Sequence, residues 1–293
     1  MPSLKEVKIR INSVSSTRKI TSAMKLVASS KLRKAQQTIG GMRPYQRRLD
    51  GMMARLTAEV GEGFSSPLSE ERPVQRAVVV CLSSNSSLCG AFNSNAIKAT
   101  LAVIEKLQKQ GARVEVIPVG QKIAEKMKKS GFSVESANAA LLDRPQYADM
   151  AAVADGLMQR FIRKEIDKVV LVYNHFKNTA TQVITTEPLL PVSLESVEAT
   201  DSQPASDNIQ DNYIIEPSGK ELLESLLPKG IALRLYTAVL DSLAAEHSAR
   251  VIAMQTATDN ADQLLHDLTL MYNKTRQSAI TAELLDIVGA SFQ

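Results

Sequence analysis

The first sixty residues carry an apolar pattern that is typical of a long helix in a coiled coil. Apolar side chains recur mostly at intervals of three and four residues, which places them on one stripe of a helix. The stripe is interrupted where Arg18 and Thr21 fall on its positions. Gly40, Gly41 and Pro44 mark an expected bend, because proline removes a helical hydrogen bond. The stripe consists of Leu4, Val7, Ile11, Val14, Met24, Ala28, Leu32, Ala35, Ile39, Met42, Leu49, Met53, Leu56 and Val60.

The middle of the chain changes to short β-branched runs that alternate with helical segments. Alternation at these lengths predicts a mostly parallel sheet covered by helices. A loop at residues 61–73 precedes this region. The expected strands are residues 76–84, 113–120, 167–176 and 180–192, and the expected helices are residues 93–111, 121–131 and 145–165, the last with Pro145 in its first turn.

The C-terminal part returns to helix. A short helix at residues 219–227 is expected to stop at Pro228, and a pattern without proline or glycine then runs from about Ile231 to Val288. Apolar positions again alternate at three and four residues, which predicts a second coiled-coil stripe. This second stripe consists of Val251, Met254, Thr258, Ala261, Leu265, Leu268 and Tyr272.

These patterns predict an α/β fold with a long antiparallel two-helix coiled coil. Each terminal helix would be roughly 85 Å long, at about 1.5 Å per residue, and the central domain is too small to cover it. The two termini are therefore expected to pack on each other, with the globular α/β domain inserted between them. The predicted ranges are an N-terminal coiled-coil helix at 1–60, the α/β domain at 75–192, an acidic loop or linker at 193–218 and a C-terminal coiled-coil helix at 219–293.

Charge is distributed unevenly along the chain, although the net charge is only +4 at pH 7. Residues 1–50 hold twelve lysines and arginines but only Glu6 and Asp50 as acids, whereas residues 193–218 hold six acids and no base. A helix face with one sign of charge lacks the pairs four residues apart that stabilise exposed helices. We therefore expect a binding partner to supply the negative charge. A nucleic acid is one alternative, but the N-terminal region holds a single aromatic residue for stacking, Tyr45.

The sequence gives little support to nucleotide binding or catalysis. It contains no G-x-x-x-x-G-K-[ST] motif, and the turn "SSNSSLCGAFNSN" after the first strand has only Gly90, where a dinucleotide fingerprint needs several glycines. Its serines and asparagines can instead cap the next helix. No G-x-S-x-G motif is present. We therefore expect no catalytic residue and no cofactor.

The cysteines and histidines also fit structural roles better than a metal site. Cys81 and Cys89 lie eight residues apart, not two to four, and the three histidines are scattered along the chain. Buried packing is the expected role of both cysteines, and their number favours a reducing compartment. No apolar run approaches the ~18 residues of a membrane span, and the N-terminus has no signal-peptide pattern.

Three segments together resemble the gamma subunit of F-type ATP synthase. They are "KEVKIRINSVSSTRKITSAMKLVASSKLRKAQQ" near the N-terminus, "LCGAFNSN" at residues 88–95 and "EHSARVIAMQTATDNADQLLHDLTLMYNKTRQSAITAELLDIVGA" near the C-terminus. The resemblance implies an antiparallel two-helix coiled coil with an inserted Rossmann-like α/β domain. It also implies a non-catalytic role as the central rotor shaft of a proton- or sodium-translocating enzyme. The implied partners are the alpha and beta subunits of the catalytic hexamer, the epsilon subunit and the c-ring, without nucleic acid or a small-molecule substrate.

The resemblance also implies specific contacts with the beta subunits. Met24 and Lys25, with Lys31 on the same basic helix, are expected to meet an acidic helix–turn segment of that subunit. Arg276 and Gln277 in "NKTRQSAI" are expected to reach a beta-subunit loop around an acidic side chain. The apolar "LLDIVGASFQ" at the C-terminus would be the tip of the shaft, in a sleeve that needs little directional bonding.

One departure from the family and two alternatives remain at this point. Family members commonly carry an Asp-Arg-Gly type sequence before "LCG", whereas this chain has Asn85, Ser86 and Ser87. The lack of a transit-peptide pattern favours a bacterial protein at the cytoplasmic face of the inner membrane, as a peripheral subunit. The alternatives are a nucleotide-dependent enzyme with coiled-coil arms and a basic coiled-coil protein that binds nucleic acid.

Overall fold

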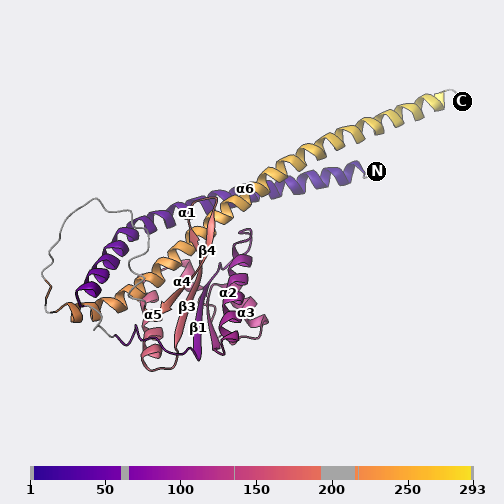
Figure 1. Ribbon diagram of the computed structural model, residues 1–293. Coiled ribbons are helices and arrows are strands. Elements are labelled where there is room, and N and C mark those ends of the chain that lie inside the picture. Colours follow the sequence, from indigo (N-terminus) through magenta and orange to yellow (C-terminus); the bar gives the residue numbers. More distant parts are fainter. Residues whose placement is uncertain (1–2, 61–65, 135, 193–214, 217, 292–293) are drawn as a thin grey trace. The chain divides into compact units, whose positions relative to one another are not determined.

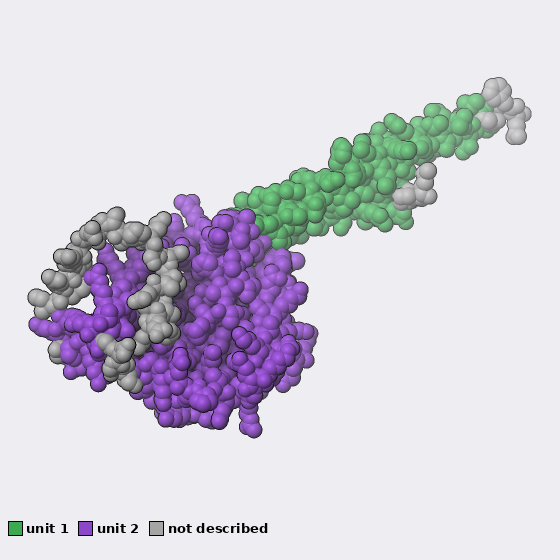
Figure 2. Space-filling view, in the orientation of Figure 1, with its two compact units in different colours: residues 1–30, 250–293 green, residues 31–249 purple. Residues whose placement is uncertain are grey.

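A computed structural model describes residues 3–60, 66–134, 136–192, 215–216 and 218–291. The chain forms two compact units, one of residues 1–30 and 250–293 and the other of residues 31–249 (Figure 2). We refer to them as the coiled-coil unit and the sheet unit. Most of the acidic range 193–218 lies outside the described residues, and the four ranges predicted from the sequence stay a prediction.

Two long helices form the two ends of the described chain, as predicted (Figure 1). Helix α1 spans Leu4–Val60 and helix α6 spans Gly219–Ser291. The expected stop at Pro228 is wrong, because α6 continues through this proline. Leu227 and Ile231 on either side of it are buried, and their packing offsets the lost helical hydrogen bond. Helix α1 likewise continues through Pro44.

The coiled-coil unit contains an antiparallel pair of helical segments. Thr21 Oγ1 lies 2.9 Å from Thr258 Oγ1, and Arg18 Nη1 lies 2.8 Å from Asp262 Oδ1. From Thr21 to Arg18 the position on α1 moves toward the N-terminus, whereas from Thr258 to Asp262 the position on α6 moves toward the C-terminus. The two segments therefore run in opposite directions. The residues that interrupt the α1 stripe therefore face α6, where they make the polar contacts between the two helices.

The buried positions of this unit repeat at the period of a coiled coil. On α1 they are seven residues apart at Val7, Thr21 and Ala28, with Val14 half-buried between them. The buried apolar positions of the α6 segment are Met254, Ala261 and Leu268. A seven-residue repeat keeps the same narrow stripe of each helix against its partner, as the sequence pattern predicted.

The sheet unit contains a four-stranded mixed sheet with strand order β2-β1-β3-β4. The first three strands are parallel, and β4 runs antiparallel to β3, which agrees with the predicted mostly parallel sheet. The strands are β1 (Arg76–Leu82), β2 (Arg113–Val119), β3 (Lys168–Phe176) and β4 (Gln182–Leu190). The helices between them are α2 (Phe92–Lys109), α3 (Gln121–Lys129), α4 (Ala140–Asp143) and α5 (Tyr147–Ile162).

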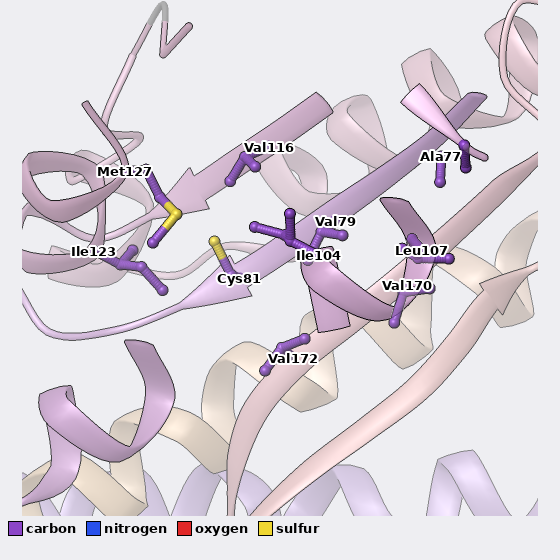
Figure 3. Packing of buried hydrophobic residues seen from close by; sticks show 11 residues of the cluster. Ala77, Val79, Cys81, Ile104, Leu107, Val116, Ile123, Met127, Val170 and Val172 are labelled. Carbon is purple, nitrogen blue, oxygen red and sulfur yellow. The ribbon is translucent and has the colours of Figure 1, made fainter. Parts of the chain in front are cut away.

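The two faces of the sheet pack against different helices. On one face, Val79 and Cys81 of β1 and Val170 and Val172 of β3 meet apolar residues of α2 and α3 (Figure 3). On the other face, Glu115 of β2 contacts Arg160 of α5, with Oε2 and Nη2 2.6 Å apart. Because β1 is covered on both faces, its side chains from Ala77 to Leu82 are all buried, which explains its continuous apolar run.

Truncating a buried residue of the coiled-coil stripe is expected to destabilise the helix pair. Leu268→Ala removes a side chain that is 7% exposed, and we expect it to lower the free energy of unfolding by about 2–5 kcal/mol. The matched control is Leu264→Ala, because Leu264 lies one turn away on the same helix and is 47% exposed. Circular dichroism during urea unfolding measures both changes. Equal losses in the two variants would show that Leu268 does not belong to the stripe.

Candidate functional site

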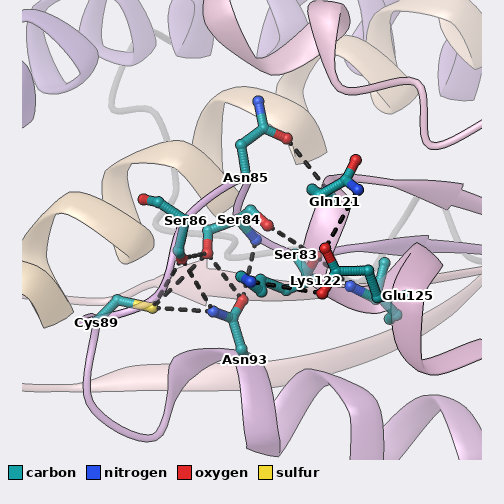
Figure 4. Close-up of polar contacts among 10 residues, drawn as sticks. Ser83, Ser84, Asn85, Ser86, Cys89, Asn93, Gln121, Lys122 and Glu125 are labelled. Atoms are coloured by element: carbon teal, nitrogen blue, oxygen red, sulfur yellow. Dashed lines mark hydrogen bonds and ion pairs between the residues drawn. The ribbon is translucent and has the colours of Figure 1, made fainter.

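The carboxyl edge of the parallel strands is the place where doubly wound folds bind their ligands. In this chain the edge holds Ser83, Ser84 and Asn85 after β1, and Gly120 after β2. Figure 4 shows that the polar residues after β1 and the starts of α2 and α3 form one continuous polar network. The contacts within the network decide which groups at this edge remain for a ligand.

The first amides of α3 donate to the loop that follows β1. Ile123 N lies 3.0 Å from Ser83 Oγ, and Lys122 N lies 3.1 Å from the carbonyl oxygen of Ser84. Gln121 N lies 3.2 Å from Asn85 Oδ1. Amides at a helix N-terminus are the groups that bind phosphate in nucleotide-binding folds. Here they are occupied by acceptors of the chain itself.

Asn93 connects the start of α2 to the same loop. Its Oδ1 accepts hydrogen bonds from the amide and the hydroxyl of Ser84, both at 3.0 Å. Its Nδ2 donates to the carbonyl oxygen of Ser86 at 3.3 Å and to Cys89 Sγ at 3.2 Å. The expectation that serine or asparagine caps α2 is wrong, because the N-cap is Ala91, without a side-chain hydrogen bond. These polar side chains hold the loop together instead.

Gly120 brings the two strand ends into close contact. Its φ is +118°, and a Cβ atom placed there would lie 2.5 Å from the carbonyl oxygen of Ser83. Only glycine fits this position without a shift of the backbone. The close approach, together with the occupied α3 amides, makes this edge a packed junction between β1, β2 and α3.

The two cysteines are both free and buried, as the sequence predicted. Burial raises the pKa of the Cys81 thiol, so this side chain stays protonated and packs as an apolar group. Among the residues that the structure describes, no group of three or more histidines, cysteines or carboxylates is arranged to hold a metal ion. In the same described part of the chain, no helix combines the length and apolar character needed to cross a membrane.

The five predicted contact residues lie on the two long helices. Met24 and Lys25 are half-buried on α1 in the coiled-coil unit, and Arg276 and Gln277 are adjacent and exposed on α6 in the same unit. Lys31 is exposed on α1, at the first position of the sheet unit. Lys31, Arg276 and Gln277 are exposed, so their side chains can contact another protein.

Sequence reasoning missed exposed apolar side chains beside these charges. Leu26 and Val27 are 68% and 58% exposed on α1, next to Lys25. The end of α6 exposes a further group: Ile280, Leu284, Leu285, Ile287 and Val288. The signal was present in the sequence, because Leu26 and Val27 are apolar residues that fall outside the stripe of their helix. The α1 surface therefore offers apolar contacts as well as positive charge.

The architecture defines a class of protein in which two terminal helices pair and a central α/β domain separates them in the sequence. Comparison with known proteins gives the family. A family model described as ATP synthase matches residues 3–291. The ATP synthase gamma chain of Bacteroides fragilis is 49% identical over 99% of both chains, and that of Flavobacterium johnsoniae is 42% identical over 99% of this chain and 98% of the relative.

Solved structures share the fold at lower sequence identity. A chain from the mitochondrial ATP synthase of Euglena gracilis aligns with a TM-score of 0.62 at 18% identity, over 99% of this chain and 93% of that one. A chain from the central stalk and c-ring structure of Tetrahymena thermophila gives a TM-score of 0.58 at 23% identity, over 81% of this chain and 99% of that one. The chain therefore belongs to the gamma subunit family of F-type ATP synthase, the family of the central stalk.

The junction at Gly120 gives a direct test of the packed carboxyl edge. We expect Gly120→Ala to lower the free energy of unfolding by about 2–4 kcal/mol, because it combines an unfavourable φ with a backbone clash. The control is Gly156→Ala in α5, where an added Cβ meets nothing within 4 Å. That change is expected to stabilise the chain by about 0.5–1 kcal/mol. Urea unfolding measures both, and a neutral Gly120→Ala would contradict the packed junction.

Proposed function

We propose that the chain is the central rotor shaft of a proton- or sodium-translocating ATP synthase, without a catalytic site of its own. The observation that carries the proposal is the family match over residues 3–291, together with the paired terminal helices. Its proposed partners are the alpha and beta subunits of the catalytic head, the epsilon subunit and the c-ring. The relatives' sources support a bacterial membrane, with the subunit peripheral at its cytoplasmic face.

The basic face of α1 is the proposed lever contact with the beta subunits. Met24, Lys25 and Lys31 would meet an acidic segment of that subunit. Exposed ion pairs contribute only about 0–1 kcal/mol each, so such a contact can form on one beta subunit and break before the next. The exposed Leu26 and Val27 beside Lys25 add apolar area to the same contact. A mixed contact of this kind transmits force without locking the shaft in one position.

Arg276 and Gln277 are proposed to form a second contact with the beta subunits, which we call the catch. Both are exposed on α6, and a guanidinium group binds a carboxylate through two parallel hydrogen bonds. Glutamine adds a neutral donor and acceptor beside it. Beyond the catch, α6 exposes the apolar side chains from Ile280 to Val288, which supports the proposed fit of the shaft tip in an apolar sleeve.

Purification from membranes tests the proposed assembly. A tagged version of the chain, expressed in place of the native gamma subunit, is expected to copurify with two partners of about 50 kDa, the alpha and beta subunits. Isothermal titration of the purified chain with ATP and with NAD tests the absence of a nucleotide site. Saturable micromolar binding of either nucleotide, without copurified partners, would favour the enzyme alternative.

Reversing the charge of the lever is expected to uncouple the enzyme. In the variant Lys25→Glu, Lys31→Glu and Lys34→Glu, we expect assembly or proton-coupled ATP hydrolysis to fall at least several-fold, because acidic groups then face an acidic partner. The purified variant is expected to remain helical. The matched control reverses Lys126, Lys128 and Lys129 on α3 and is expected to leave coupling unchanged. Normal coupled hydrolysis in the α1 variant would refute the lever assignment.

Removing the catch is expected to reduce ATP synthesis while assembly is retained. Arg276→Lys keeps the charge but loses the planar donor pair, so we expect a loss of several-fold. Arg276→Ala with Gln277→Ala removes all these hydrogen bonds, and a loss of about tenfold or more is expected. Synthesis by inverted membrane vesicles measures the effect, with Lys274→Ala as an exposed control on the same helix. If the double variant synthesises ATP at the parental rate, the catch assignment is wrong and the lever contact alone must couple rotation to synthesis.

A further inference from the structure

Seven ionisable side chains meet inside the sheet unit, between the sheet and the long helices. They come from four elements that are far apart in the sequence, and the proposed lever and catch use none of them. Helix α1 contributes Arg43 and Asp50, β3 contributes Tyr173 and His175, β4 contributes Glu187, and α6 contributes Arg234 and Asp241. We call this group the polar cluster.

Asp241 is the centre of the polar cluster and the most deeply buried of its carboxyl groups. The residue is 5% exposed. Its Oδ2 contacts His175 Nδ1 at hydrogen-bonding distance, while its Oδ1 has no hydrogen-bond partner among the described residues and lies 3.9 Å from Arg43 Nη2. The close neighbour that can neutralise Asp241 is therefore His175. The side chain of His175 is 40% exposed, so it can exchange a proton with solvent.

The remaining charged groups of the polar cluster interact mainly with one another. Arg234 is the cation that acts on both Asp50 and Glu187. Glu187 also accepts a hydrogen bond from the Tyr173 hydroxyl. Burial raises the pKa of Tyr173, so this hydroxyl keeps its proton and adds no negative charge. Arg234 is therefore engaged by two other carboxyl groups, and the arginine beside Asp241 is Arg43, at 3.9 Å.

When all its carboxyl groups are ionised and His175 is neutral, the polar cluster carries one more negative charge than positive charges. One additional proton brings its net charge to zero. Its carboxyl groups are Asp50, Glu187 and Asp241, against the two guanidinium groups of Arg43 and Arg234. Burial raises the pKa of each of these carboxyl groups, and it is the largest contribution at all of them. An unbalanced negative charge away from water is unfavourable. A proton on His175 or Asp241 removes it.

We propose that the polar cluster is a pH-sensitive latch that ties the sheet to α6 through His175 and Asp241. With the extra proton bound, the two side chains form a charge-assisted or neutral hydrogen bond across the β3–α6 contact. Without it, Asp241 keeps its negative charge, and among the residues that the structure describes its arginine partner is Arg43, at 3.9 Å. The latch is therefore closed at lower pH and weakened at higher pH, independently of any role in rotation.

The sign of the effect on stability follows from proton linkage. A carboxyl group whose pKa is raised by folding holds its proton more tightly in the folded chain than in the unfolded chain. Its contribution to stability is complete below the unfolded pKa of about 4 and is lost as the pH rises through the folded value. The raised pKa values of Asp50, Glu187 and Asp241 all act in this direction. We therefore expect the sheet unit to lose stability as the pH rises from mildly acidic to alkaline.

Thermal unfolding of the full chain at several pH values tests the latch. Between about pH 5.5 and about pH 8.5, we expect the melting temperature of the wild-type chain to fall by several degrees, because the raised pKa values of the three carboxyl groups favour the folded chain at the acidic end. His175→Gln is expected to flatten this dependence by about 2–4 °C, mainly through a lower melting temperature at the acidic end. His266→Gln is the matched control, because His266 is an exposed histidine of α6 in the coiled-coil unit. It is expected to keep the wild-type slope.

Two further measurements complete the test. Asp241→Asn keeps the shape of the side chain but removes the buried charge, so we expect it to flatten the slope and to match or exceed the wild type at the alkaline end. Urea unfolding of the wild type in weak buffer near neutral pH is expected to release protons, and this measurement needs no variant. Equal slopes for the wild type and His175→Gln, or no proton release on wild-type unfolding, would overturn the proposal.

Discussion

The pairing of the two terminal helices along one narrow apolar stripe is the constraint on which the coiled-coil unit depends. Helices of this length cannot be covered by the central domain, so each must bury its apolar stripe against the other. Residues seven apart, such as Val7, Thr21 and Ala28, supply that burial on α1. The Thr21–Thr258 contact places a polar pair within the stripe, where its hydroxyls are satisfied by each other and by backbone carbonyls. Because the stripe is narrow, most of the side chains of both helical segments in the coiled-coil unit remain exposed.

The inserted domain uses the edge that often binds nucleotides for its own cohesion. The α3 amides donate to Ser83, Ser84 and Asn85, and Gly120 allows the two strand ends to approach within contact distance. A doubly wound topology alone therefore says little about activity, since the function depends on which groups remain available at the edge. In this chain the hydrogen bonds at the edge stiffen the connection between neighbouring strands.

The sequence predicted the elements whose evidence is periodic and missed the features that depend on tertiary contacts. The strand runs were correct because burial on both faces gives continuous apolar runs, and the α6 stripe was correct because burial against one partner imposes a period of three to four residues. The expected stop at Pro228 was wrong because buried neighbours on both sides outweigh one lost hydrogen bond. The short helix α4 left no periodic signal, since it has only four residues. The polar cluster was invisible, because residues such as Asp50 and Asp241 meet only after folding. The contact residues lie on predicted helices, but their partners belong to other chains.

The two faces of the sheet are held by different physical interactions, and this difference determines where pH can act. The face toward α2 and α3 is packed with apolar side chains, such as Val79 of β1 and Met127 of α3, which carry no charge at ordinary pH (Figure 3). The face toward α6 instead includes Glu187 and Asp241, whose pKa values are raised by burial, and His175, which contacts Asp241. A change of pH should therefore leave the sheet and its α2–α3 layer intact while it alters the attachment of α6. Under the proposed latch, the connection between the sheet and α6 is therefore the part of the sheet unit that responds to pH.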